Sequence, residues 1–364
     1  MPKVVISGYY GFHNSGDEAI LFAMLMALRD VAPDLEAIVL SGDPAYTARE
    51  FGVRSIPRDN PSQVIKALAG CDLLISGAGG LLQDINGPRS IIYYLGVVLM
   101  ARLLGKPVFF YAQGFGPVSS AIGKALVRQV ANRVNAITVR DPDSRDELSA
   151  LGVTRPLLKV TADPVLGLDP SLVDISKGRE ILTLLGADNR PLAGISVRPW
   201  KGLDGYKEAI AKAADDLLEE GWQVVFVPMH CPGDVITGRE VAARMRGRAL
   251  LFEEQADYMN ILSVTANLDL AVGMRLHFLI FSVIFGVPVV GIPYDPKVNR
   301  FLQSVGLPDG FNAERLDYYE LSAGIRNALD QLDEISGSLK ARVAPLRAEA
   351  LKNAVMAAEL LRPV

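Results

Sequence analysis

The sequence has few cysteines, a small net charge and no apolar run long enough to cross a bilayer. Cys71 and Cys231 stand far apart and outside any CxxC or Cys/His cluster, which excludes a disulfide framework and a structural zinc site. The 37 Lys and Arg residues face 41 Asp and Glu residues, so the formal net charge is −4 at pH 7. Because no global positive field exists, we expect no nucleic-acid partner, and any anion must be bound by a local group of cations.

Targeting and metal motifs are also missing. The N-terminus MPKVVISGYYG is typical of a strand rather than an export signal, which predicts a cytoplasmic location. The apolar run from Ile91 ends at Arg102, and the run from Phe278 is interrupted by Gly286 and Pro288, so both are shorter than the ~20 residues of a membrane span. HExxH and HxE are absent, and we predict neither a metal nor a cofactor.

Apolar strand-like runs alternate with helical periodicity along most of the chain, which predicts an α/β protein with parallel sheets covered by helices. The tail from Tyr318 onward is predicted to be helical, with a kink or break at Pro345. The predicted strands of the first half are residues 3–7, 36–40, 72–76, 107–112 and 136–140, and those of the second half are 192–197, 222–228, 268–272 and 287–293.

This rhythm predicts two Rossmann-like domains with the active site in the cleft between them. The first domain is expected over residues 1–170 and the second over 171–335. Residues 336–364 form a helical tail that is free to cross back onto the first domain, which sequence cannot decide. Ligands of such sheets collect at the carboxyl ends of the strands, where the glycine clusters of this chain stand.

The loop after the first predicted strand, residues 8–18, carries Asn14 and Asp17. Its glycine spacing is not G-x-G-x-x-G, and its acidic residues disfavour a phosphate loop. Ser15 with Glu18 three residues later fits a capping box, a purely structural interpretation. The alternative is that Asn14 and Asp17 meet sugar hydroxyls, because a carboxylate at a strand end can accept a hydroxyl proton.

Other strand ends carry five further candidates. Gly79, Gly80 and Gln113 are predicted to lie in loops where a ligand can approach the backbone closely, although a tight turn also explains them. Arg140 and Arg198 end strands in the two halves and are expected to face a ligand crevice, unless they merely pair with a neighbouring carboxylate.

The segment GMRLH, residues 273–277, precedes an apolar helix and brings two cationic residue types together. In an extended loop Arg275 and His277 share a face, and both are predicted at the helix N-terminus, where backbone N–H groups favour an anion. Lys297 follows the next strand, so adjacent strand ends are predicted to present all three side chains to one ligand. A packing role for His277 and a solvated turn for Lys297 are the simpler alternatives.

Six segments stand in order over nearly the whole chain: GYYGFHNSGDEAIL, SGAGGLLQD, AQGFGPV, TVRDPDS, GMRLH and GIPYDPKV. Together they resemble the polysaccharide pyruvyl transferase family, in the bacterial branch linked to cell-wall polymers. The resemblance implies a GT-B-like fold and a transferase that uses phosphoenolpyruvate as its donor substrate, with residues 1–170 on the acceptor side and 171–335 on the donor side. It also implies a ketal formed across two hydroxyls of a sugar or lipid-linked saccharide, with release of phosphate.

By the same resemblance, Arg140, His277 and Lys297 contact phosphoenolpyruvate, and Arg275 is expected beside them. The chemistry agrees, because a carboxylate and a phosphate on three carbons need converging cations without needing a basic protein. We assign His277 as the general acid, since an imidazole titrates near neutral pH, and Asp17 as the candidate base for a sugar hydroxyl.

Two other functions compete with this interpretation. A nucleotide-sugar glycosyltransferase of the GT-B type would also carry GVPVVGIP after an apolar helix, but residues 278–285 hold no carboxylate to bind a ribose. A non-catalytic sugar-binding protein explains the glycines and aromatic residues but not the clustered cations. The acceptor sugar, the linkage of the ketal, the oligomeric state and a transient association with a membrane surface are left open.

Overall fold

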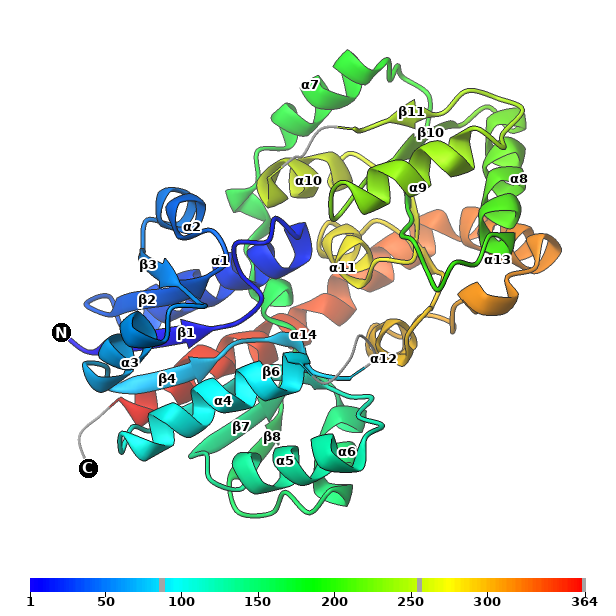
Figure 1. The fold of residues 1–364 in the computed structure, drawn as a ribbon. Coiled ribbons are helices and arrows are strands. Elements are labelled where there is room, and N and C mark those ends of the chain that lie inside the picture. The colour runs from blue at the N-terminus through cyan, green and yellow to red at the C-terminus, as the bar shows by residue number, and fades with distance from the viewer. Residues whose placement is uncertain (85–88, 254–256, 362–364) are drawn as a thin grey trace. The chain divides into compact units, whose positions relative to one another are not determined.

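The computed structural model describes residues 1–84, 89–253 and 257–361, and its chain forms two compact units (Figure 1). The first unit contains Met1–Phe12, Asp17–Leu168 and the chain from Leu346 onward, and the second contains His13–Gly16 and Asp169–Pro345. The units meet in sequence at Leu168 and Asp169, near the predicted boundary at residue 170. The short segment His13–Gly16 was expected in the first domain but clusters with the second unit.

The first unit is built on a sheet in which every strand pair is parallel. Its order is β3-β2-β1-β4-β6-β7-β8, with β5 paired to β6, so the direction in which the sheet grows reverses between β1 and β4. The strands are β1 (Lys3–Ser7), β2 (Glu36–Ser41), β3 (Arg54–Pro57), β4 (Leu73–Ser76), β5 (Gly79–Leu82), β6 (Val108–Phe115), β7 (Ala136–Val139) and β8 (Leu157–Val160).

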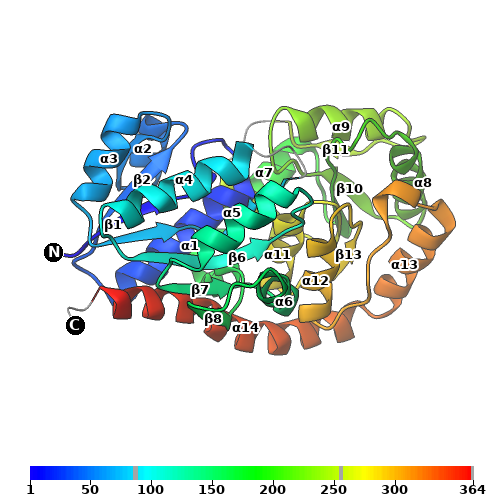
Figure 2. The ribbon, with the colours of Figure 1, turned by 60° about the horizontal axis from the view of Figure 1, so that its bottom comes forward.

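Helices cover both faces of this sheet. Helices α4 and α5 lie on one face, and the C-terminal part of α14 lies on the other (Figure 2). Apolar side chains such as Val108, Phe110 and Ile137 are fully buried in the core. The helices of this unit are α1 (Ser15–Val31), α2 (Pro44–Phe51), α3 (Pro61–Ala69), α4 (Arg89–Leu103), α5 (Ala121–Ala131), α6 (Pro142–Ala150) and the 3₁₀ turn η1 (Pro164–Gly167).

The second unit repeats this plan with a smaller parallel sheet. Its order is β11-β10-β9-β12-β13, and its growth reverses between β9 and β12. The strands are β9 (Leu192–Ser196), β10 (Gln223–Phe226), β11 (Leu250–Leu251), β12 (Leu270–Gly273) and β13 (Val289–Gly291). The helices are η2 (Pro170–Leu172), α7 (Ile175–Leu185), α8 (Gly205–Glu219), α9 (Gly233–Ala242), α10 (Tyr258–Thr265), α11 (Leu276–Ile284), α12 (Pro296–Ser304), η3 (Ala313–Arg315), α13 (Tyr318–Asp330) and α14 (Leu332–Leu360).

The predicted break at Pro345 is wrong, because α14 continues through this residue. A proline inside a helix removes one backbone hydrogen bond, and packing on both sides can offset that loss. Leu339 before Pro345 and Asn353 after it are both fully buried. The part of α14 up to Pro345 belongs to the second unit, and the part from Leu346 belongs to the first unit.

Asn353 holds the C-terminal part of α14 in the first unit. Its side-chain oxygen lies 3.0 Å from the hydroxyl of Thr161, and its amide donates to the carbonyl oxygen of Ala350 at 2.8 Å. We expect Asn353→Ala to lower the free energy of unfolding by about 2 kcal/mol, because two buried hydrogen bonds of its side chain are lost, although the Thr161 hydroxyl keeps the carbonyl oxygen of Val139 as an acceptor at 3.3 Å. Lys352→Ala, on the exposed side of the same turn, is the matched control. Urea denaturation followed by circular dichroism measures both, and equal effects would contradict the prediction.

Candidate functional site

Three cations of the second unit follow strands that are neighbours at the reversal point of its sheet. Arg198 comes after β9, Arg275 after β12 and Lys297 after β13. Strand β12 is parallel to both β9 and β13, so the carboxyl ends of the three strands lie at the same edge of the sheet. Open α/β sheets bind ligands at this edge, where the order of the strands reverses.

Two of these cations lie against the ring of Tyr294. Cζ of Arg198 is 4.4 Å from the ring centroid, and Nζ of Lys297 is 5.2 Å from it. The ring of Trp200 lies beside Tyr294 with 4.8 Å between centroids, and Arg198 is 5.4 Å from that ring. These cation–π contacts hold the two positive groups near one point.

The pKa of Tyr294 reports the local electrostatics. Burial raises the pKa of this phenol, but Lys297, Arg198 and Arg275 all lower it, and the net pKa is below the ordinary value. A pKa that is lowered despite burial indicates a positive potential at the phenol oxygen. Tyr294 and Trp200 were not among the predicted site residues, although each follows a strand closely, as Lys297 and Arg198 do.

Arg275 differs from the other two cations because its charge is compensated. Its Nε donates to Oδ2 of Asp234 at 2.9 Å, and its Nη2 donates to Oδ1 of the same carboxylate. Asp234, in the first turn of α9, is buried and also accepts from the N–H groups of Met229 and His230 at 3.0 Å each. Asp234 was not among the predicted site residues, because nothing in the sequence links residue 234 to residue 275.

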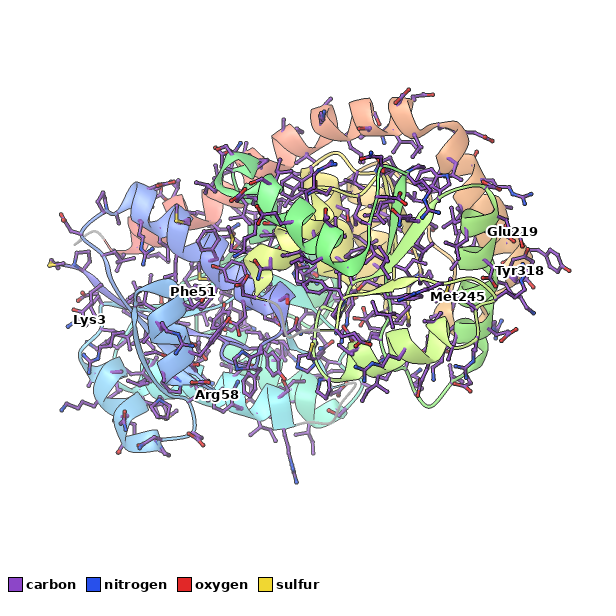
Figure 3. All side chains as sticks on the ribbon, turned by 90° about the horizontal axis from the view of Figure 1, so that it is seen from above. Lys3, Phe51, Arg58, Glu219, Met245 and Tyr318 are labelled. Atoms are coloured by element: carbon purple, nitrogen blue, oxygen red, sulfur yellow. The ribbon has the colours of Figure 1, made fainter. Side chains whose placement is uncertain are left out.

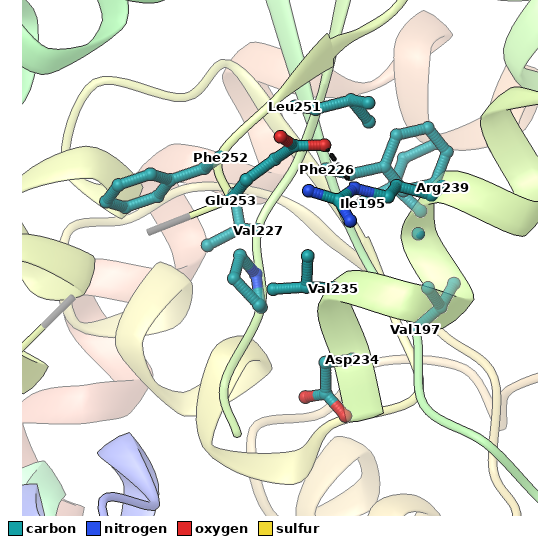
Figure 4. Close-up of a pocket in the computed structure, with 12 residues that line it drawn as sticks. Ile195, Val197, Phe226, Val227, Asp234, Val235, Arg239, Leu251, Phe252 and Glu253 are labelled. Atoms are coloured by element: carbon teal, nitrogen blue, oxygen red, sulfur yellow. Dashed lines mark hydrogen bonds and ion pairs between the residues drawn. The ribbon is translucent and has the colours of Figure 1, made fainter. Parts of the chain in front are cut away.

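A small apolar pocket lies beside Asp234 and is lined by residues of β9, β10 and α9 (Figure 4). The cation at this pocket, Arg239, is neutralised by Glu253, with 2.6 Å between Nε and Oε1. The carboxylate of Asp234 points away from this ion pair in the close-up. The pocket therefore lacks the uncompensated positive charge that is present around Tyr294.

His277 lies in the first turn of α11, which begins at Leu276, and Arg275 occupies the N-cap position. Both residues are at the helix N-terminus, but they do not share an extended face, because the helix starts one residue before His277. The guanidinium of Arg275 binds Asp234, whereas the ring of His277 packs against Gly16 so closely that a Cβ there would overlap it.

The segment around Gly16 belongs to the second unit through backbone contacts. Asn14 forms an antiparallel bridge with His230, and the N–H of Ser15 donates to the carbonyl oxygen of Met229 at 2.9 Å. The side-chain oxygen of Asn14 accepts from the N–H of Gly16 at 3.1 Å, so Asn14 binds the backbone at the start of α1.

The predicted capping box of Ser15 and Glu18 is wrong in its partners. Glu18 accepts from the N–H of Gly11 at 2.9 Å, and the N–H of Ser15 is already bonded to Met229. Gly11 has a φ of +74°, a left-handed conformation that folds the loop back over the helix start. The tertiary contact with Met229 thus replaces the local bond that the sequence pattern indicated.

Arg140 belongs to the first unit and is paired there. Its Nη1 donates to Oδ2 of Asp163 at 2.8 Å, and the guanidinium packs against Gly114, which has no room for a Cβ. Asp141 next to it caps α6 by accepting from the N–H of Ser144 at 2.7 Å, as its position before Pro142 indicates. Arg140 thus pairs with a neighbouring carboxylate, as the structural alternative predicted. Its contact with phosphoenolpyruvate stays a prediction.

The glycine and glutamine candidates of the first unit lie in strands rather than loops. Gly79 and Gly80 begin β5, and Gln113 lies within β6, which extends to Phe115. The buried side chain of Gln113 donates to the carbonyl oxygens of Ser76 and Gly77, and so it ties β6 to the end of β4. These contacts are structural.

Asp17, in the first turn of α1, faces the same strand ends. A Cβ on Gly79 would lie 3.4 Å from its Oδ1. The pKa of buried Tyr10 is raised by burial first and by Asp17 next, which places the Asp17 carboxylate near this phenol. The role of Asp17 as a general base stays a prediction.

A second aromatic and cationic cluster in the first unit was missed in the sequence. Arg58 follows β3, and its guanidinium lies 3.9 Å from the ring centroid of Tyr93 and 5.2 Å from that of Phe12 (Figure 3 labels Arg58). Phe12 stacks on Tyr9 at 4.3 Å between centroids. Tyr9, Phe12 and Arg58 follow strands of one parallel sheet, so an aromatic surface lies at its carboxyl edge.

Within residues 1–84, 89–253 and 257–361, no group of three or more His, Cys, Asp or Glu side chains is placed to hold a metal ion. In the same part of the chain, no helix is both long enough and apolar enough to cross a membrane.

Two parallel-sheet α/β units define a GT-B-type enzyme fold, and solved structures agree. MnaA of S. aureus, solved with UDP, has a TM-score of 0.69 at 14% identity and covers 98% of this chain and 95% of its own. HepE of Anabaena, solved with UDP and glucose, has a TM-score of 0.66 at 15% identity and 99% coverage of both chains. At these identities the likeness shows the fold alone.

The family follows from sequence. The family model for polysaccharide pyruvyl transferases matches residues 14–296, and the chain belongs to this family. It is also 25% identical over 285 residues to the amylovoran biosynthesis protein AmsJ of Erwinia amylovora, covering 72% of this chain and 67% of that one. The resemblance seen in the separate motifs is thereby confirmed, and the chain is a transferase of polysaccharide biosynthesis.

The pairing of Arg275 with Asp234 predicts that two arginines of the same sheet edge contribute unequally to stability. Arg275→Ala is expected to lower the free energy of unfolding by about 3–5 kcal/mol, because it leaves the buried Asp234 carboxylate unpaired. Arg198→Ala is the control and should cost about 1 kcal/mol or less, since it loses cation–π contacts and one long, exposed hydrogen bond to the carbonyl oxygen of Pro199. Both tryptophans, Trp200 and Trp222, lie in the second unit, so urea denaturation followed by tryptophan fluorescence measures this unit. A smaller loss for Arg275→Ala than for Arg198→Ala would contradict the assignment.

Proposed function

We propose that the chain transfers the pyruvyl group of phosphoenolpyruvate to two hydroxyls of a saccharide. Protonation of the methylene carbon converts it to a methyl group and leaves a cationic carbon, which one hydroxyl attacks with loss of its proton. Cleavage of the C–O bond then releases phosphate, the second hydroxyl attacks, and its proton leaves with the phosphate. The pyruvyl carbon keeps its oxidation level, so the transfer needs no redox cofactor.

The convergence of cations on Tyr294 carries this proposal. Arg198 stacks on aromatic rings, and no ion pair with a carboxylate neutralises it among the described residues. Lys297 has only a 3.7 Å contact with Asp295. A ligand with a carboxylate and a phosphate a few bonds apart matches two such cations. We therefore assign Arg198 to the phosphoenolpyruvate site.

Each remaining candidate receives a separate role. Arg275 orients the end of β12 through Asp234, and it adds positive potential near Tyr294. His277 is the proposed general acid, because an imidazole can donate a proton near neutral pH. In the first unit, Arg140 is proposed to bind phosphoenolpyruvate, and Asp17 is proposed as the base that accepts the proton of a sugar hydroxyl. The saccharide acceptor, free or lipid-linked, is assigned to the first unit.

Donor binding tests the cation cluster directly. Lys297→Met is expected to weaken phosphoenolpyruvate binding at least about tenfold in a calorimetric titration, since a cation close to the anionic donor is removed. Lys201→Met is the matched control, because Lys201 also lies over the Trp200 ring but is paired with Glu314 at 2.6 Å. Its affinity should stay within about twofold of wild type.

Unchanged donor affinity in Lys297→Met would remove this residue from the site. The nucleotide-sugar alternative is tested in the same preparation by thermal stabilisation, since a ligand that binds the native state raises the melting temperature. Stabilisation by UDP-glucose and none by phosphoenolpyruvate would overturn the proposed donor.

The proton donor is tested by turnover. His277→Ala is expected to keep the fold while phosphate release at saturating donor falls by about 100-fold or more, the usual scale of general acid catalysis. Phosphate release from phosphoenolpyruvate is measured with a panel of saccharide acceptors at saturating donor. The control is His230→Ala, since His230 contributes its backbone to the Asn14 bridge. Near-normal release by His277→Ala would refute the assignment.

A further inference from the structure

Helices α3, α4 and α5 form a surface of the first unit that contains no acidic residue. The three helices contact one another in the order α3, α4, α5, and they lie side by side in both ribbon views (Figures 1 and 2). We call their outer side the basic helix face. In the whole chain acidic residues outnumber basic ones, yet these helices carry only cations: Lys66, Arg89, Arg102, Lys124 and Arg128.

The cations of the basic helix face are not neutralised by the fold. Lys66, Arg89, Lys124 and Arg128 are exposed, and among the described residues none of them forms an ion pair with a carboxylate. Arg102 donates to the carbonyl oxygen of Lys106 and to the side chain of Asn135, both uncharged acceptors.

Three acidic residues flank these helices in sequence: Asp59 before α3 is exposed, whereas Asp72 and Asp84 bind backbone N–H groups of other segments. Asp72 accepts from the N–H of Lys3 at 2.8 Å. Asp84 accepts from the N–H groups of Ser119 and Ser120 at 2.8 Å each, and these bonds hold its pKa at about 2 although burial opposes them. The positive charge of the basic helix face thus stays open to a partner.

The same face exposes an isoleucine on each of its helices. The side chains of Ile65, Ile92 and Ile122 are 45%, 56% and 76% exposed. Single exposed apolar residues are common, but three on adjacent helices that also lack acidic residues form a combined apolar and cationic surface.

We propose that the basic helix face binds the surface of an anionic lipid bilayer. Lysine and arginine are attracted to anionic headgroups, and isoleucine side chains can enter the boundary between headgroups and acyl chains. A nucleic acid would use the cations but gain little from the isoleucines, and a second copy of the chain would bring two positive surfaces together. This inference does not depend on the donor chemistry.

The test is flotation of the full chain with vesicles of phosphatidylglycerol and phosphatidylcholine at a 3:7 ratio, against vesicles of phosphatidylcholine alone. We expect binding to the anionic vesicles only, and its loss at high salt, because screening weakens charge attraction. Lys66→Gln with Lys124→Gln and Arg128→Gln should lower the partition coefficient for the anionic vesicles about fivefold per cation removed. Ile92→Ser with Ile122→Ser should also reduce binding at unchanged charge.

Helix α7 of the second unit supplies the matched control. Like the basic helix face, it exposes two cations, Lys177 and Arg179, and the apolar Leu184. Unlike that face, it also carries an exposed acidic residue, Glu180. Lys177→Gln with Arg179→Gln and Leu184→Ser should leave vesicle binding unchanged. The proposal is overturned if the wild type does not float with anionic vesicles, or if the α7 variant loses as much binding as the variants of the basic helix face. A dimer in solution that Ile92→Ser with Ile122→Ser converts to monomer would also overturn it.

Discussion

The parallel pairing of β9 with β12 decides which side chains of the second unit meet. These strands are far apart in sequence, and the sheet grows in opposite directions from them. The connections that leave the two strands therefore run in opposite directions, and the space at their adjacent carboxyl ends is left open. Arg198 and Arg275 follow those ends. Lys297 follows β13, the next strand, and completes the positive potential at Tyr294. The proposed donor chemistry depends on this strand order.

The cations of this edge divide into two kinds. Arg275 is bound by a buried carboxylate that also orders the backbone of residues 229–230, so it stabilises the shape of the edge. Arg198 lies against aromatic rings and has no ion pair among the described residues, and Lys297 lies against Tyr294 with a long 3.7 Å contact to Asp295, so both keep positive charge available to a ligand. The distinction arises because a buried ion pair satisfies its charges internally, whereas a ring face attracts a cation without neutralising it.

The strands with continuous apolar sequences were predicted from the sequence, and the structure confirms them at the core of each sheet. Strand β1 has its predicted bounds, and β7 ends one residue earlier than predicted. Strands β3 and β8 were not predicted, because they are edge strands with exposed and half-buried residues. The loop positions of Gly79 and Gln113 were also wrong, since the pairing of β5 with β6 extends the sheet beyond the apolar runs.

By itself the sequence determined the α/β class, the parallel sheets, the family and the type of residue needed for an anionic donor, because periodicity and local motifs are properties of neighbouring residues. Only the tertiary structure decided that Asp234 binds Arg275, that Tyr294 gathers three cations, and that residues 13–16 belong to the second unit. It also decided that α14 ends in the first unit. These are contacts between residues distant in the chain, which the order of the strands sets and no local pattern records.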